Sequence, residues 1–205
     1  MLDHLVYAAP DLDAAVDELE RRLGVRAAPG GRHPARGTYN ALLSLGDGAY
    51  LEIIAPDPQQ PDPDASRSFA VDQLDAPLLR TWAAKAPDIE QRVARARAAG
   101  YDPGDPRAMS RERPDGVTLS WQLTASGLPA GGWLVPFLID WGDSPHPAGS
   151  APEGVTVESL RAEHPQPETV RPLLDALEVE LDVTTGPAPR LVARLNTPRG
   201  LVELE

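Results

Sequence analysis

The stretch that decides the fold is residues 2–24, which read LDHLVYAAPDLDAAVDELERRLG. Residues 2–9 are apolar and typical of a β-strand, and Pro10 ends that strand. Asp11 can cap a helix that Gly24 ends. Between these two residues, apolar side chains recur on one helical face: Leu12, Ala15, Val16, Leu19 and Leu23. Strands predicted at 25–28, 39–45 and 49–54, with turns at 30–31 and 46–48, complete the order βαβββ.

The same pattern recurs twice further along the chain. Pro87-Asp88 follows Pro10-Asp11 after 77 residues, and the apolar face of a second helix begins behind it. Strands are predicted at 79–86, 107–113, 117–124 and 133–141. A third copy has a strand at 155–161, a helix that starts near Glu168, and a hairpin of 190–196 with 201–205. Repetition at a constant spacing predicts a chain built from similar modules.

We therefore divide the chain into three βαβββ modules. Module one is 1–56, module two is 78–142 and module three is 153–205, with a Pro/Asp-rich loop at 57–77 and a linker at 143–152. The predicted class is α+β, a half-open cup of mixed and antiparallel strands with the helices outside. Two such sheets side by side close a cup, and cups bind small molecules.

The Pro/Asp-rich loop contains a short segment, 62–66, that weakly resembles a calcium-binding loop. Arg67 and Gln73 stand where such a loop needs Gly and Glu. A solvated loop, or a lid over a site, is the better prediction.

The composition of the chain excludes several classes of protein. Of 205 residues, 41% are hydrophobic, which is enough for a sizeable core. A net charge of -12 speaks against nucleic acid or an anionic membrane as partner. There is no cysteine, which excludes thiol catalysis and thiolate metal sites and fits a cytoplasmic location. The first residues lack a signal peptide, and the longest apolar run, 133–139, is too short to cross a bilayer.

Two polar residues interrupt apolar strand faces in module one. By alternation, His4 shares a face with Leu2 and Val6, and Glu52 shares one with Tyr50 and Ile54. An imidazole and a carboxylate that meet on one concave sheet are half of a metal site, or a hydrogen-bonded pair that satisfies itself. The corresponding residues are Thr81 and Phe137 in module two, and Glu158 and Glu203 in module three. For the two glutamates of module three we favour solvent exposure.

Further candidates lie in a glycine-rich turn and in module two. His33 follows Gly30-Gly31 and is a ligand, a general base or a loop residue. No phosphate-binding loop, dinucleotide fingerprint or nucleophile elbow is present. His146 is expected at the rim of the cup. Large aromatic residues gather on the last strands of module two and form either core or an aromatic wall for an organic ligand: Trp121, Trp133, Phe137 and Trp141.

These residues also carry a family resemblance. The opening LDHLV and the Pro-Asp-Leu helix start resemble the vicinal oxygen chelate superfamily, which includes glyoxalase I, extradiol dioxygenases and bleomycin-resistance proteins. More narrowly, the chain is similar to the glyoxalase-like domain family through GGRHP at 30–34, GTYN at 37–40, YLEI at 50–53, and PFLIDW at 136–141 followed by His146-Pro147. The similarity covers nearly the whole chain.

The resemblance implies one divalent metal ion, of unknown identity, held by first- and last-strand residues of two modules. His4 and Glu52 match these positions, whereas Thr81 and Phe137 depart from them. This leaves a degenerate site completed by His33, His146 or water, or a metal-free cup. It also leaves a cup of modules one and three, which would gather Glu158 and Glu203 at the site. We favour the pairing of modules one and two, because neighbouring units usually pack together.

We carry two main hypotheses for function. One is a metal-dependent enzyme of the lyase, isomerase or dioxygenase type, acting on a small oxygenated organic molecule, with Glu52 or His33 as the base. The other is a non-catalytic protein that binds or sequesters a small molecule, as bleomycin-resistance proteins do. In both, the expected ligand-binding residues are Asn40, Trp121, Phe137, Trp141 and His146. A third hypothesis is a structural or regulatory module.

Module three has no partner sheet in a two-module cup. Its apolar strand residues must therefore either cover the other modules or pair with a second copy as a homodimer: Leu191, Val192, Leu195, Leu201, Val202 and Leu204.

Overall fold

The fold repeats the order βαβββ three times in a computed structural model that describes residues 1–33, 36–60, 67–112, 116–124 and 132–205. The first run comprises β1 (Leu2–Ala8), α1 (Leu12–Leu23), β2 (Ala28–His33), β3 (Thr38–Ser44) and β4 (Tyr50–Pro56). The second comprises β5 (Leu78–Lys85), α2 (Ile89–Ala98), β6 (Pro106–Glu112), β7 (Thr118–Thr124) and β8 (Phe137–Asp140). The third comprises β9 (Thr156–His164), α3 (Pro167–Ala176), β10 (Asp182–Thr185), β11 (Arg190–Thr197) and β12 (Gly200–Leu204). Short 3-10 helices lie at η2 (Ser68–Gln73), η3 (Gly132–Leu134) and η4 (Pro147–Gly149).

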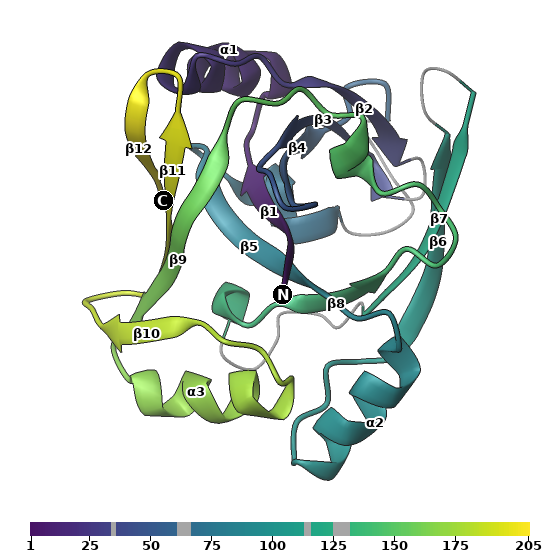
Figure 1. The fold of residues 1–205 in the computed structure, drawn as a ribbon, viewed down its shortest axis with the longest axis vertical. Coiled ribbons are helices and arrows are strands. Elements are labelled where there is room, and N and C mark those ends of the chain that lie inside the picture. Colours follow the sequence, from purple (N-terminus) through teal and green to yellow (C-terminus); the bar gives the residue numbers. More distant parts are fainter. Residues whose placement is uncertain (34–35, 61–66, 113–115, 125–131) are drawn as a thin grey trace.

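Modules one and two share one curved, eight-stranded sheet in the order β2-β3-β4-β1-β5-β8-β7-β6. The two halves join through antiparallel β1 and β5, and in each half the first strand runs parallel to the last, β1 with β4 and β5 with β8. Figure 1 shows the sheet curling around a central space, with α1 and α2 outside it. The predicted α+β cup, a curved sheet with the helices outside, is confirmed.

Helix α1 forms because its ends are capped and one of its faces is apolar. The Asp11 side chain accepts a hydrogen bond from the Ala14 N–H at 2.9 Å, and Gly24 ends the helix in a left-handed conformation with φ 79°. The predicted apolar face is buried in full: Leu12, Ala15, Val16, Leu19 and Leu23. It packs into the core on the side of the sheet opposite the cup.

Module three has the same element order as the others but a different strand pairing. Its sheet is ordered β10-β9-β11-β12, so its first strand pairs with β10 and β11 and not with its last strand. Glu158 and Glu203 therefore lie on strands separated by β11, and both are exposed beside arginines. A cup of modules one and three does not form, and the expectation of solvent exposure is correct.

The sheet of module three covers the back of the cup. Leu191, Val192, Leu195 and Leu204 are buried, and strand β11 lies beside β5 (Figure 1). The Leu79 N–H donates to the Glu205 carbonyl at 2.9 Å, which ties the two sheets together. Of the apolar strand residues only Leu201 is exposed, and Val202 is half-buried. The covering arrangement is the one observed, and the homodimer stays a prediction.

Several predicted boundaries were wrong. Gly30-Gly31 lies inside β2, which starts at Ala28, and is not a turn. The predicted strand at 133–141 is a 3-10 turn, η3, followed by the shorter β8. The segment at 62–66, with its weak calcium-loop pattern, lies outside the described residues. In the part of the chain that is described, no helix has the length and apolar character needed to span a bilayer.

Candidate functional site

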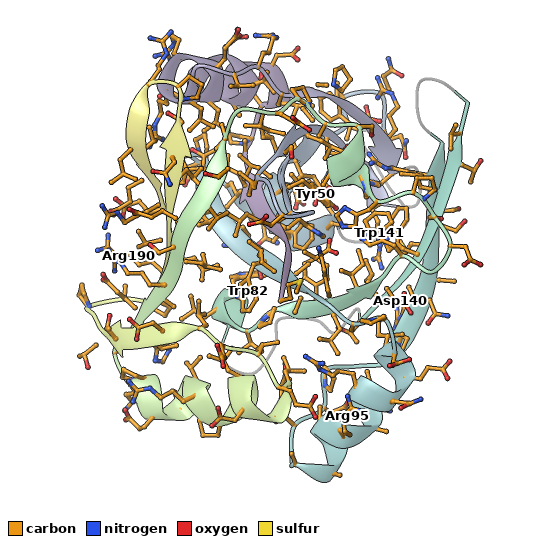
Figure 2. All side chains as sticks on the ribbon, viewed as in Figure 1. Tyr50, Trp82, Arg95, Asp140, Trp141 and Arg190 are labelled. Atoms are coloured by element: carbon orange, nitrogen blue, oxygen red, sulfur yellow. The ribbon has the colours of Figure 1, made fainter. Side chains whose placement is uncertain are left out.

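The concave face of the large sheet carries the candidate site, because strand alternation sorts side chains between two faces. His4 and Val6 on β1 and Tyr50, Glu52 and Ile54 on β4 point into the cup. Their neighbours along each strand join the core behind the sheet. Figure 2 shows Tyr50 and Trp141 inside the curve of the sheet, and Trp82 on its other side, near β5 and β9. A cavity of about 70 Å³ lies between these side chains.

His4 is held by a buried carboxylate that the sequence pattern did not single out. The His4 Nδ1 lies 2.7 Å from Oδ1 of Asp3, which is fully buried. Burial alone would raise the pKa of Asp3, but hydrogen bonds from His146 and His4 bring it well below its usual value. Because an ionised Asp3 only accepts, His4 donates from Nδ1 and presents its other nitrogen, Nε2, to the cup.

Asp3 reaches side chains that line the cup, His4 and Trp141, because β1 is irregular at its start. Alternation places Asp3 on the face opposite His4, but the pairing of β1 with β5 shifts register between Leu2 and His4. The Asp3 carboxylate therefore accepts bonds from His4, from Trp141 Nε1 at 3.3 Å and from His146 Nε2 at 3.1 Å. The only signal for it in the sequence was a carboxylate beside an inward histidine in an apolar strand.

Glu52 is held from the other side of the cup. Its Oε1 accepts a bond of 2.5 Å from Asn40 Nδ2, and Asn40 Oδ1 accepts one of 2.8 Å from Arg111 Nη1. These two partners fix the orientation of the Asn40 amide. The second carboxylate oxygen, Oε2, lies 3.8 Å from His4 Nε2. Glu52 and His4 thus face each other across the cavity, as their strand positions predicted, too far apart for a direct hydrogen bond.

Gly30 explains how Arg111 reaches Asn40. A Cβ atom at Gly30 would lie 2.3 Å from Asn40 Oδ1 and 2.8 Å from Arg111 Nη1. Any side chain at this position of β2 would displace the bond between these two residues. Gly30 therefore serves the site by leaving room for side chains, and not by forming a turn. Sequence reasoning missed Arg111, because a contact across 71 positions depends on the closing of the sheet.

The two halves of the cup can be compared directly through their registers. Val6 pairs with Glu52 in module one, and Ala83 pairs with Phe137 in module two. On the central strands, His4 pairs with Ala83 and Val6 pairs with Thr81. Thr81 and Phe137 therefore occupy the positions of His4 and Glu52.

Module two thus brings no metal-binding side chain to the equivalent places. Across the described residues, no three His, Asp or Glu side chains come together in a way that could hold a metal ion. His4 Nε2 and Glu52 Oε2 are two converging donors, but the residues present do not fit a four-ligand metal centre.

Aromatic side chains form the other wall of the cavity. Tyr50 stacks on the His4 ring with centroids 4.5 Å apart, and Phe137 meets the same ring edge-on at 5.4 Å. Trp121 and Trp141 lie 5.1 Å apart, and both line the cavity. Trp121, Phe137 and Trp141 therefore line the cavity, and Trp133 lies outside it. An apolar wall keeps water away from the polar pair and strengthens electrostatic interactions there.

The two other candidate histidines, His33 and His146, differ in their access to the cavity. His33 lines it, with Nδ1 3.1 Å from the Thr38 hydroxyl, and burial lowers the pKa of His33, which keeps its ring neutral near pH 7. His146 does not line it. Its Nδ1 accepts from the Ala148 N–H at 3.2 Å, so its Nε2 carries the proton that it donates to Asp3. His146 therefore supports Asp3 from outside.

The chain matches one family model and is similar in structure to solved proteins. The family model of the glyoxalase-like domain matches residues 2–178. No curated protein matches the sequence. The structure is similar to that of a hypothetical protein from Staphylococcus aureus, with a TM-score of 0.71 at 15% identity, over 100% of this chain and 98% of that one. A methylmalonyl-CoA epimerase from Mycobacterium tuberculosis aligns with a TM-score of 0.46 at 21% identity, over 72% of this chain and 91% of that one.

Proposed function

The chain belongs to the glyoxalase-like domain family, within the vicinal oxygen chelate superfamily, and on this basis we propose that its cup binds a small oxygenated organic anion and moves a proton on it. One observation carries the proposal. Glu52 Oε2 and His4 Nε2 converge at 3.8 Å over one cavity, and each side chain is fixed through its other polar atom, by Asn40 and by Asp3. Groups held this way are pre-organised to act on a bound molecule.

The proposed reaction is proton transfer at the carbon beside a carbonyl group. Glu52 Oε2 takes the proton, and the electron pair of the broken C–H bond moves to the carbonyl oxygen as an enolate. The buried guanidinium of Arg111 lies at the same cavity and attracts the developing negative charge. Return of the proton to the same carbon inverts or restores its configuration, and return to a neighbouring atom gives a tautomer, so the reaction is of the isomerase type. His4 Nε2 accepts a hydrogen bond from the protonated Glu52 or from the substrate.

The experiment begins with a thermal-shift screen of small 2-oxo and 3-oxo carboxylic acids. For each acid that binds, NMR in D₂O follows deuterium exchange at the carbon beside the carbonyl. We expect Glu52→Gln to slow exchange by about 10²- to 10⁴-fold while the acid still binds. The control is Glu158→Gln, an exposed carboxylate on the other sheet, which should leave the rate unchanged.

Three outcomes would contradict the proposal. If His33→Asn abolishes exchange and Glu52→Gln does not, the base is His33. If acids bind without any exchange, the cup is a sequestering site, the alternative that its aromatic wall supports. If no acid binds, the ligand class is wrong.

The proposed proton transfer uses no divalent metal, although the family resemblance implies one. His4 and Glu52 would hold such an ion, and it would polarise a carbonyl oxygen. Because Thr81 and Phe137 supply no further ligands, we expect the purified protein to carry well under one equivalent of metal. Elemental analysis measures this, and one equivalent that survives dialysis would contradict it.

A further inference from the structure

A second hollow opens directly beside the cup. It has a volume of about 730 Å³ and is lined from η2, β5, β6, β7 and η3. Phe69, Met109, Leu123 and Phe137 line both this hollow and the cavity at His4 and Glu52. The two spaces therefore lie side by side, with these side chains between them.

Arginines gather in this hollow, although the chain as a whole is acidic. Arg36, Arg67, Arg80 and Arg107 line it, and we call it the arginine groove. Its described carboxylate is Asp72, which is exposed. The chain has 31 acidic and 19 basic residues. Four arginines around one hollow therefore make a locally positive surface on a protein with a negative net charge.

Three of these arginines have no acidic partner among the described residues: Arg36, Arg80 and Arg107. Elsewhere in the described chain many arginines contact carboxylates, and Arg97 and Arg190 each contact two of them, whereas Arg22 and Arg171 donate to backbone carbonyls. Arg80 is half-buried and held in place, because its Nε donates to the Phe69 carbonyl at 3.1 Å and its guanidinium lies 4.2 Å from the Trp133 ring centre. A guanidinium group that is held in place and has no acidic partner, such as that of Arg80, can bind an anion in that orientation.

We propose that the arginine groove binds a phosphate-bearing arm of the same molecule whose small oxygenated head enters the cup. The inference rests on the proposed function, which supplies the head. Several guanidinium groups around one hollow match a group with at least two negative charges, and their planar forks match phosphate oxygens in pairs. Aromatic side chains beside the arginines cover the apolar part of such an arm: Phe69, Trp133 and Phe137.

The test uses inorganic pyrophosphate as the probe, titrated calorimetrically into the full chain. We expect binding to the wild type, weakened about tenfold by Arg36→Ser and again by Arg107→Ser, as for the loss of a charged hydrogen bond. The control is Arg194→Ser, which removes an arginine that pairs with Glu158 on the other sheet. Equal affinity in all three variants, or no binding to the wild type, would overturn the proposal.

A second probe separates phosphate from carboxylate. Citrate carries a similar charge, and citrate binding as tight as that of pyrophosphate would show that the groove is not built for phosphate. Glu52→Gln separates the groove from the cup. We expect this variant to keep its affinity for pyrophosphate even though it loses proton exchange. If pyrophosphate does not bind but deuterium exchange depends on Glu52, only the proposal for the groove fails. If pyrophosphate binds but no exchange is seen, only the proposed proton transfer fails.

Discussion

Modules one and two place the same backbone positions around the cup and fill them with different side chains. Their first strands pair antiparallel, so positions 77 residues apart are related by an approximate two-fold axis. At these positions module one has Asp3 and His4, and module two has Arg80 and Thr81, while strand register makes Phe137 the counterpart of Glu52. One half therefore supplies the polar pair, whereas the other supplies a wall and a cation. The symmetry of the backbone does not predict symmetry of the chemistry.

The same asymmetry appears in the helices behind the sheet. Leu19 of α1 and Ala96 of α2 stand at equivalent positions, and both are buried. The larger side chain shows that module one contributes more apolar volume to the shared core at this point.

The largest expected effect comes from making the first helix resemble the second. Leu19→Ala should lower the free energy of unfolding by about 2–5 kcal/mol, because it leaves a cavity in the core. Chemical denaturation measures the loss, and Leu201→Ala, at a position 50% exposed, is the control with an expected change within about 0.5 kcal/mol. If Leu19→Ala lowers the free energy of unfolding by no more than about 0.5 kcal/mol, the apolar face of α1 does not stabilise module one.

A second change would make the halves of the cup alike in chemistry. Thr81→His with Phe137→Glu adds the two missing donors at the related positions, and we expect Zn²⁺ to bind at least about a hundredfold more tightly than to the wild type. Titration calorimetry measures the gain, circular dichroism checks the fold, and Thr81→Ser with Phe137→Leu is the control without donors. Equal affinity in the wild type would mean that His4 and Glu52 suffice.

The smallest effect concerns Asp3, which has no acidic counterpart in module two. Its folded pKa is depressed below the ordinary 3.8, so its stabilisation is complete above that pH and is lost as pH falls toward the folded value. Asp3→Asn should therefore cost about 1–3 kcal/mol at pH 7 and less near pH 3. Urea unfolding at both pH values measures this. A penalty that stays constant with pH would show that charge is not what holds His4.

Local patterns in the sequence predicted the elements well. Helical spacing located the buried face of α1, and alternation put His4 and Glu52 on one face, because both signals depend only on nearby residues. Asp3 escaped prediction because a register shift breaks the alternation. Arg111 escaped it because β6 approaches β2, and Arg111 reaches Asn40 on β3, only when the sheet curls. Strand pairing escaped it too, because module three pairs differently although its element order is the same.

The arginine groove also bears on how fast a ligand arrives. A chain with a net charge of -12 repels anions over most of its surface, so an approaching anion encounters attraction chiefly where unpaired guanidinium groups face outward. Encounters are thereby biased toward one mouth of the molecule and one orientation of the ligand, with the charged arm trailing in the groove. Added salt screens both the repulsion and the attraction. The association rate constant therefore falls with salt if attraction by the groove dominates, and rises if repulsion by the rest of the surface dominates.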